Sequence, residues 1–81
     1  MTFTARINVM PRHELADPEG QTIERALPRI GFDDVSDVRV GKRIELKLDA
    51  SDESDARDKV REMCERMLAN TVIESYEVEI Q

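Results

Sequence analysis

The sequence has little of what catalytic and ligand-binding sites are usually built from. It contains one cysteine, one histidine, one tyrosine, three glycines and no tryptophan. A single cysteine excludes an internal disulfide and is typical of a reducing compartment. No glycine-rich phosphate-binding loop of recognisable type is present. The N-terminus lacks an apolar block of signal-peptide length, and no apolar run approaches the roughly 20 residues that span a bilayer. We therefore expect a cytoplasmic protein without membrane contact.

Negative charge predominates. Charged residues make up 37% of the 81 residues, and the net charge is −6. An acidic surface repels phosphate groups, which argues against general binding of nucleic acids or anionic membranes. The length predicts a single domain, residues 1–81, that buries only about 60–65% of its unfolded surface. Self-association is a common remedy for so small a core.

The first part of the chain predicts a strand and then a helix. Apolar and polar residues alternate from Phe3 to Val9, which is typical of a strand with one buried face. Asp17 suits a helix N-cap, Pro18 suits the first helical position, and Gly31 is a natural C-terminal stop. Pro28 predicts a kink in this helix, or its end near Leu27.

Two readings remain open for residues 38–48. A three-residue turn, Gly41-Lys42-Arg43, would make a hairpin that pairs Val40 with Ile44 and keeps one face apolar, and we favour it. One long bent strand would preserve the same phase.

A second helix and a last strand complete the pattern. Ser51 or Asp52 can cap the helix, and Asn70 can close it in the left-handed conformation. Its apolar stripe predicts the buried face: Ala56, Val60, Met63, Cys64, Met67 and Leu68.

The element order predicts an α+β fold. The order is β-α-β-β-α-β, which is ferredoxin-like, and it predicts an antiparallel sheet with both helices on one face. Val35 and Ile73 lie out of phase with the main apolar sets, so they could form a second apolar face and a dimer interface.

The sequence gives no indication that reactive side chains come together in one site. His13 lies in a loop without an evident partner, and Cys64 lies on an apolar stripe. Asp49, Asp52 and Asp55 could be drawn as a cation site, but a capped helix N-terminus explains them better. We expect no catalytic, cofactor-binding or metal-binding residue in this chain.

Nucleic-acid binding has weak support as well. RNA-recognition domains share this element order but need stacking aromatic residues, and Phe3 and Tyr76 do not supply such a platform. Arg39, Lys42 and Arg43 form the only compact basic cluster. It is either the solvated tip of a hairpin or a contact for an anion or an acidic partner.

Three segments together resemble one family. They are Leu15–Gly20, Asp37–Lys42 and Met63–Glu74, and the last contains the sequence L-A-N-T-V-I-E. In this order and spacing, across nearly the whole chain, they resemble PurS, the family of small subunits of phosphoribosylformylglycinamidine synthase. Pro28 departs from the helix former expected at that position.

The resemblance implies a non-catalytic subunit. PurS proteins form dimers or larger assemblies and join the synthetase PurL and the glutaminase PurQ, bridging the two and supporting ammonia transfer. The complex converts formylglycinamide ribonucleotide, glutamine and ATP to formylglycinamidine ribonucleotide, glutamate, ADP and phosphate in purine biosynthesis. ATP and magnesium belong to the large subunit.

The motif positions are expected to serve structure or interfaces. They are Asp17, Pro18, Gly20, Arg39, Gly41, Lys42, Leu68, Ala69, Asn70 and Thr71. A regulatory ligand-binding domain of the ACT type is the alternative, although the loop after the first strand lacks the glycine that would support it. A stand-alone enzyme of the acylphosphatase class is a third possibility.

Overall fold

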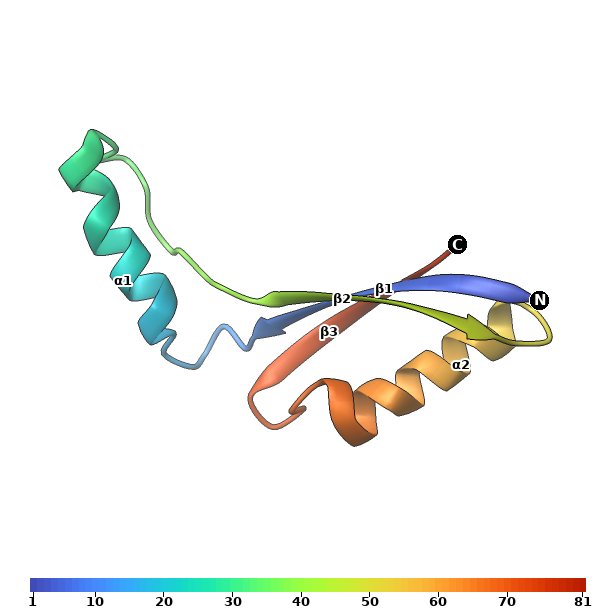
Figure 1. The fold of residues 1–81 in the computed structure, drawn as a ribbon. Coiled ribbons are helices and arrows are strands. Elements are labelled where there is room, and N and C mark those ends of the chain that lie inside the picture. Colours follow the sequence, from blue (N-terminus) through green and yellow to red (C-terminus); the bar gives the residue numbers. More distant parts are fainter.

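The computed structural model describes residues 1–81 and confirms an antiparallel α+β fold (Figure 1). Its elements are β1 Thr2–Pro11, α1 Pro18–Ala26, β2 Lys42–Asp49, α2 Glu53–Met63 and β3 Glu74–Ile80. A 3-10 turn, Leu27–Ile30, follows α1, and a π-helical turn, Cys64–Leu68, follows α2. None of the helices has the length and the apolar content of a membrane span.

The sheet has the strand order β2-β1-β3, with both edge strands antiparallel to β1. Ile7 lies opposite Ile44 on one side and Val78 on the other. Because side chains alternate along each strand, these apolar residues share one face, while Arg6, Glu45 and Glu79 share the opposite face. One face of the sheet is therefore apolar and the other is polar.

Helix α2 covers part of the apolar face. Val60 and Cys64 are fully buried against Ile7 and Val9 of β1. Met67 is 84% exposed, so the predicted apolar stripe is wrong at that position. The core is correspondingly small, with 9 of 81 residues buried.

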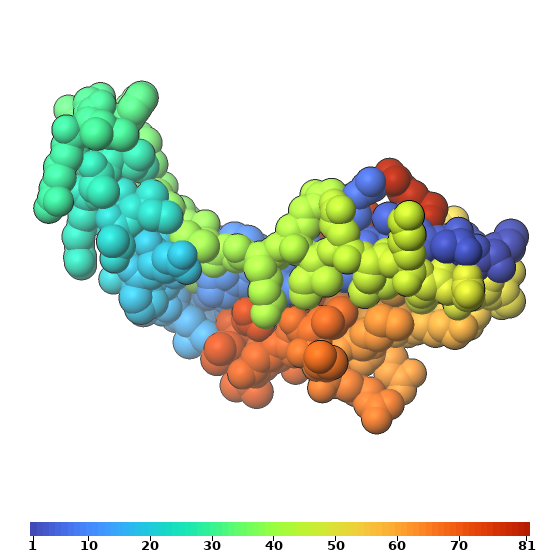
Figure 2. All heavy atoms as spheres, in the orientation of Figure 1, coloured from blue at the N-terminus to red at the C-terminus, as the bar shows by residue number.

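Residues 12–41, here called the arm, project from one end of the sheet (Figure 1). The arm contains α1, the 3-10 turn and an irregular return segment, and it does not lie over the sheet. The space-filling view shows it as a separate lobe joined by a thin neck (Figure 2). The molecule is accordingly elongated, with principal extents of 51 × 25 × 14 Å.

The hairpin prediction is wrong. Residues 38–40 form no strand, and β2 begins at Lys42 and pairs with β1 along its length. The backbone amides of Val38 and Val40 are instead bound by side chains of Glu24 and Asp17, which hold this stretch beside α1. The sheet has three strands, and only α2 covers its apolar face, so the expectation of two helices on one face is also corrected.

The predicted helix ends are mostly confirmed. Asp17 caps α1, the α-helix stops at Ala26 before Pro28, and Gly31 is left-handed with a φ of 100°. Asp52 caps α2. Asn70 is not left-handed, because Asp37 is the one non-glycine residue with a positive φ, so that prediction is wrong.

Candidate functional site: a junction of three motifs

The three sequence motifs meet at the end of the sheet where the arm begins. This junction consists of Arg12, residues 15–20, residues 37–41 and the turn at residues 69–74. The motifs are far apart in the chain, yet hydrogen bonds connect each to the next. The junction is therefore a built site and not three separate loops.

Asp17 links the first motif to the second. One carboxylate oxygen accepts a hydrogen bond from the Gly20 amide at 3.1 Å, and the other accepts one from the Val40 amide at 2.7 Å. These two bonds, that from Val40 first, hold the pKa of Asp17 below its ordinary value. The same side chain thus caps α1 and anchors the return segment.

Two glycines permit close approach of backbone segments. A Cβ on Gly20 would lie 2.1 Å from the carbonyl oxygen of Val38, and one on Gly41 would lie 2.3 Å from that of Val9. No side chain fits in either place without movement of the backbone. Both motif glycines therefore serve the contact between the arm and the rest of the chain.

Arg12 connects the arm to the third motif. Its side chain donates two hydrogen bonds to the carbonyl oxygen of Thr71, at 3.2 and 2.7 Å from Nε and Nη2. Its backbone amide donates to the carbonyl of Ile73 at 2.9 Å, and its own carbonyl accepts bonds from the Leu15 amide at 3.1 Å and from the Arg39 side chain. Arg12 is thus the residue that joins all three motifs.

The third motif forms a tight turn before β3. The carbonyl of Asn70 accepts bonds from the amides of Ile73 and Glu74 at 3.0 and 2.7 Å. The Glu74 carboxylate accepts from the Asn70 amide at 2.8 Å, so the turn is closed from both ends. Ala69 is buried in the core, which fixes the turn to the sheet.

Not every predicted residue belongs to the junction. Pro18 occupies the first turn of α1, and Leu68 packs against the core. Lys42 is exposed at the start of β2, and the neighbouring Arg43 forms an ion pair with Glu45 at 3.3 Å. Arg39 donates to the carbonyl of Arg12 and its Nε is buried, whereas Lys42 and Arg43 are exposed, so the three residues do not form one solvated basic cluster.

A shallow cavity of about 370 Å³ opens at the junction. Its lining is half apolar and comes from all three motifs: Pro11, Leu15, Ala16, Asp17, Val40, Ile73 and Glu74. Leu15 and Ile73 are 38% and 46% exposed there. Exposed apolar side chains beside fixed polar groups suit contact with another protein.

The candidate reactive groups lie elsewhere and apart. His13 is exposed. Cys64 is buried, and burial with the nearby Glu65 charge raises the pKa of its thiol, which disfavours the reactive thiolate.

The acidic cluster before α2 has a structural role. Asp52 accepts a bond from the Asp55 amide at 2.8 Å, and Asp55 accepts one from the Ser51 amide at 2.9 Å. Asp49 accepts a bond from the Thr2 hydroxyl. Asp52 and Asp55 thus hold the first turn of α2, and Asp49 joins the end of β2 to the start of β1. No group of three or more acidic, cysteine or histidine side chains is placed to hold a metal ion.

The polar face of the sheet offers no stacking platform. Phe3 and Tyr76 both lie on the α2 side, and the Tyr76 hydroxyl donates to Glu65 at 2.7 Å. The face that is open carries Arg6, Glu45 and Glu79 instead. This arrangement lacks the aromatic surface of an RNA-recognition domain.

Sequence reasoning missed Arg12 and Glu24. Both act on backbone groups, Arg12 on Thr71 and Glu24 on the Val38 amide at 3.0 Å. A lone charged residue that binds a distant main chain leaves no periodic or spacing signal. Glu24 follows Ile23 in α1, and no feature of the neighbouring sequence indicates that its carboxylate binds the Val38 amide.

Comparison with known proteins gives one consistent result. The family model "PurS: Phosphoribosylformylglycinamidine (FGAM) synthase" matches residues 4–81. The PurS subunit of this synthase from a Synechocystis strain is 46% identical over 98% of this chain and 79% of its own length. The subunit from Bacillus subtilis is 39% identical over 98% of this chain and 93% of its own length.

Solved structures agree with the sequence comparison. The PurS subunit of Thermotoga maritima has a TM-score of 0.91 at 38% identity and covers all of this chain and 93% of that one. A chain from the PurLQS structure of the same organism has a TM-score of 0.91 at 37% identity, with 100% and 99% coverage.

Proposed function

Because this chain belongs to the PurS family, we propose that it is the non-catalytic PurS subunit of phosphoribosylformylglycinamidine synthase, a glutamine- and ATP-dependent ligase of purine biosynthesis. The observation that carries the proposal is the family match over residues 4–81. The junction supports it, since three motifs far apart in the chain build one partly apolar surface there. This family sets aside the ACT-type and acylphosphatase alternatives.

The partners are the synthetase PurL and the glutaminase PurQ. A relative with the same fold is part of the PurLQS structure of Thermotoga maritima. In the proposed complex this chain contacts both enzymes and bridges them. The ATP and magnesium sites are on PurL, and the complex works in the cytoplasm.

Such a subunit is useful because the reaction has an intermediate, ammonia, that must pass from one enzyme to the other. Glutamine hydrolysis yields glutamate and ammonia, and the ammonia then replaces the amide oxygen of formylglycinamide ribonucleotide while ATP becomes ADP and phosphate. Free ammonia would be protonated and lost to water. A subunit that fixes the orientation of the two enzymes and excludes water keeps the two half-reactions coupled.

The test is omission of this chain from a reconstituted complex. We expect PurL and PurQ without it to lose most glutamine-dependent synthesis, because ammonia no longer reaches the synthetase. Synthesis from added ammonium salt should change little, since PurL carries the chemistry. Rates of formylglycinamidine ribonucleotide formation with each nitrogen source measure both effects.

Bovine serum albumin at the same concentration is the control for nonspecific stabilisation. Equal glutamine-dependent rates with and without the chain would overturn the proposal, and so would turnover by the chain alone.

A further inference from the structure

The arm is joined to the rest of the molecule only at its base (Figure 1). Helix α1 lies away from the sheet and from α2, so packing on them does not set its position. The chain passes through a narrow neck twice, once where β1 ends at Pro11 and once where β2 begins at Lys42 (Figure 2). The angle between the arm and the sheet therefore depends on the few contacts made at this neck.

Arg12 makes every hydrogen bond that connects the arm to the rest of the molecule. Its side chain donates two, both to the Thr71 carbonyl, and its backbone amide donates one to the Ile73 carbonyl. No ion pair joins the arm to the sheet or to α2. Removal of the guanidinium thus leaves a single hydrogen bond between the two parts.

Both segments of the neck meet at Arg12. Its carbonyl accepts bonds from the Leu15 amide, on the outgoing segment, and from the Arg39 side chain, on the returning one. The bond between Asp17 and the Val40 amide joins the same two segments, so the base of the arm is one unit. A change in the direction of the backbone at Arg12 would turn the whole arm.

The junction cavity lies between the two parts that Arg12 connects. Its lining comes from both: Leu15, Ala16, Asp17 and Val40 belong to the arm, and Pro11, Ile73 and Glu74 do not. A rotation at the neck changes the separation of these two walls. The shape of the partly apolar surface at the junction therefore depends on the Arg12 side chain.

We propose that Arg12 is a positioning residue for ammonia transfer, because its guanidinium keeps the arm and the turn at residues 69–74 in the one arrangement that the two enzymes bind. The inference rests on the proposed function, since only a bridging subunit needs this arrangement. Without the guanidinium the neck bends and the enzymes lose their mutual orientation. Ammonia then escapes to water before it reaches the synthetase.

The glutamate released per molecule of formylglycinamidine ribonucleotide formed measures this escape. Complexes of PurL and PurQ with wild-type chain or with Arg12→Ala are compared at saturating concentrations of the chain. We expect about twice as much glutamate per product with Arg12→Ala, because part of the ammonia is lost between the enzymes. The rate from added ammonium salt should not change, since PurL is the same in both complexes.

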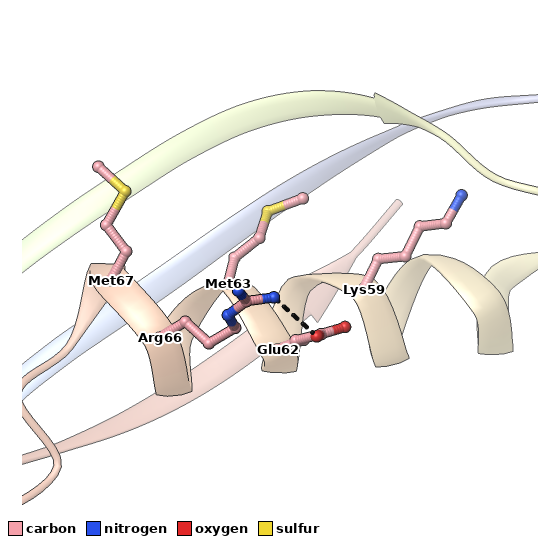
Figure 3. A pocket seen from close by; sticks show the side chains of 5 residues that line it. All are labelled: Lys59, Glu62, Met63, Arg66 and Met67. Carbon is pink, nitrogen blue, oxygen red and sulfur yellow. Dashed lines mark hydrogen bonds and ion pairs between the residues drawn. The ribbon is translucent and has the colours of Figure 1, made fainter.

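Two further variants provide the comparison. Arg12→Lys keeps the positive charge but not the two-pronged contact, so it should restore only part of the coupling. Arg66→Ala is the matched control, because the Arg66 guanidinium lies on the surface of α2 and pairs with Glu62 of the same helix at 3.2 Å (Figure 3). An exposed pair of this kind contributes little to the fold, so Arg66→Ala should keep the wild-type glutamate ratio.

Spin labels measure the neck directly. In a Cys64→Ala background, labels at Arg25→Cys in α1 and Lys47→Cys in β2, both exposed, report the distance between the arm and the sheet. The labelled chain is diluted with excess unlabelled chain, so that only distances within one chain are recorded. We expect a broader distance distribution when Arg12→Ala is added, and the wild-type distribution when Arg66→Ala is added.

The outcomes separate this inference from the proposed function. A wild-type chain that fails to raise glutamine-dependent synthesis would count against the proposed function itself. If the wild-type chain supports synthesis, an unchanged glutamate ratio with Arg12→Ala would overturn the positioning role, and an unchanged distance distribution would do the same. Should Arg12→Ala unfold by circular dichroism, Arg12→Lys carries both comparisons.

Discussion

At the scale of single residues, the junction depends on side chains that bind backbone groups of distant segments. Asp17 uses both carboxylate oxygens, one on α1 and one on the return segment. Arg12 uses its side chain on the third motif and its carbonyl on Arg39. Such contacts fix the backbone positions of the junction, and a docking surface requires fixed positions.

Asp17 should make stability depend on pH. Its folded pKa is below the ordinary value of the unfolded chain, so its contribution is present above the unfolded pKa and is lost as pH falls through the folded pKa. Asp17→Asn should therefore be less stable than wild type at pH 7, and the difference should shrink below about pH 4. Urea unfolding at a series of pH values measures it.

Asp55 also has a lowered pKa, from its bond with the Ser51 amide, but it is unchanged in both proteins and its effect cancels in the comparison. Stability curves of wild type and Asp17→Asn that stay parallel down to pH 2 would contradict this role of Asp17.

At the scale of elements, the junction couples the arm to the turn at residues 69–74. We expect Arg12→Ala to speed amide exchange at Ile73 and Glu74 about tenfold, because the turn loses two charge-assisted bonds to the Thr71 carbonyl. Hydrogen exchange monitored by NMR checks this. His13→Ala, at an exposed neighbour, is the control and should leave these amides unchanged.

Arg12→Lys separates charge from geometry. A lysine keeps the positive charge but cannot reproduce the two-pronged contact of the guanidinium, so exchange should remain faster than in wild type. Unchanged exchange in both Arg12 variants would show that the turn holds itself through Asn70 and Glu74 alone.

Elements with a local signal could be predicted from the sequence. The alternation in β1, the Asp17 and Asp52 caps and the stop before Pro28 all depend on neighbours within a turn or two. The position of the arm could not be predicted. The sequence pattern of Val38 and Val40 favours a strand. The hydrogen bonds from their amides to Glu24 and Asp17, which hold them beside α1 instead, span 14 and 23 residues.

The candidate site was predicted only in part, again because some of its contacts join residues far apart in the sequence. The recognisable segments supplied four residues of the junction: Asp17, Gly20, Arg39 and Gly41. Arg12 lies outside those segments, and its partner Thr71 is 59 residues away. Only the folded chain brings that pair together.

At the scale of the whole molecule, the chain is a thin layer with a projecting arm (Figure 2). Its small core, exposed apolar groups and closed polar junction all indicate a protein that is completed by neighbours. Such a subunit contributes surface to a complex. The complex therefore needs a fixed number of copies of this chain for each copy of the enzymes that it joins. A catalyst would be needed only in traces.

A titration distinguishes these two cases most directly. Increasing amounts of this chain are added to fixed, equal amounts of PurL and PurQ, well above their dissociation constants, and the glutamine-dependent rate is followed. We predict a linear rise that ends sharply at a fixed molar ratio of chain to synthetase. Full activity from an amount far below that of PurL would contradict the account, because one copy would then serve many synthetases in turn.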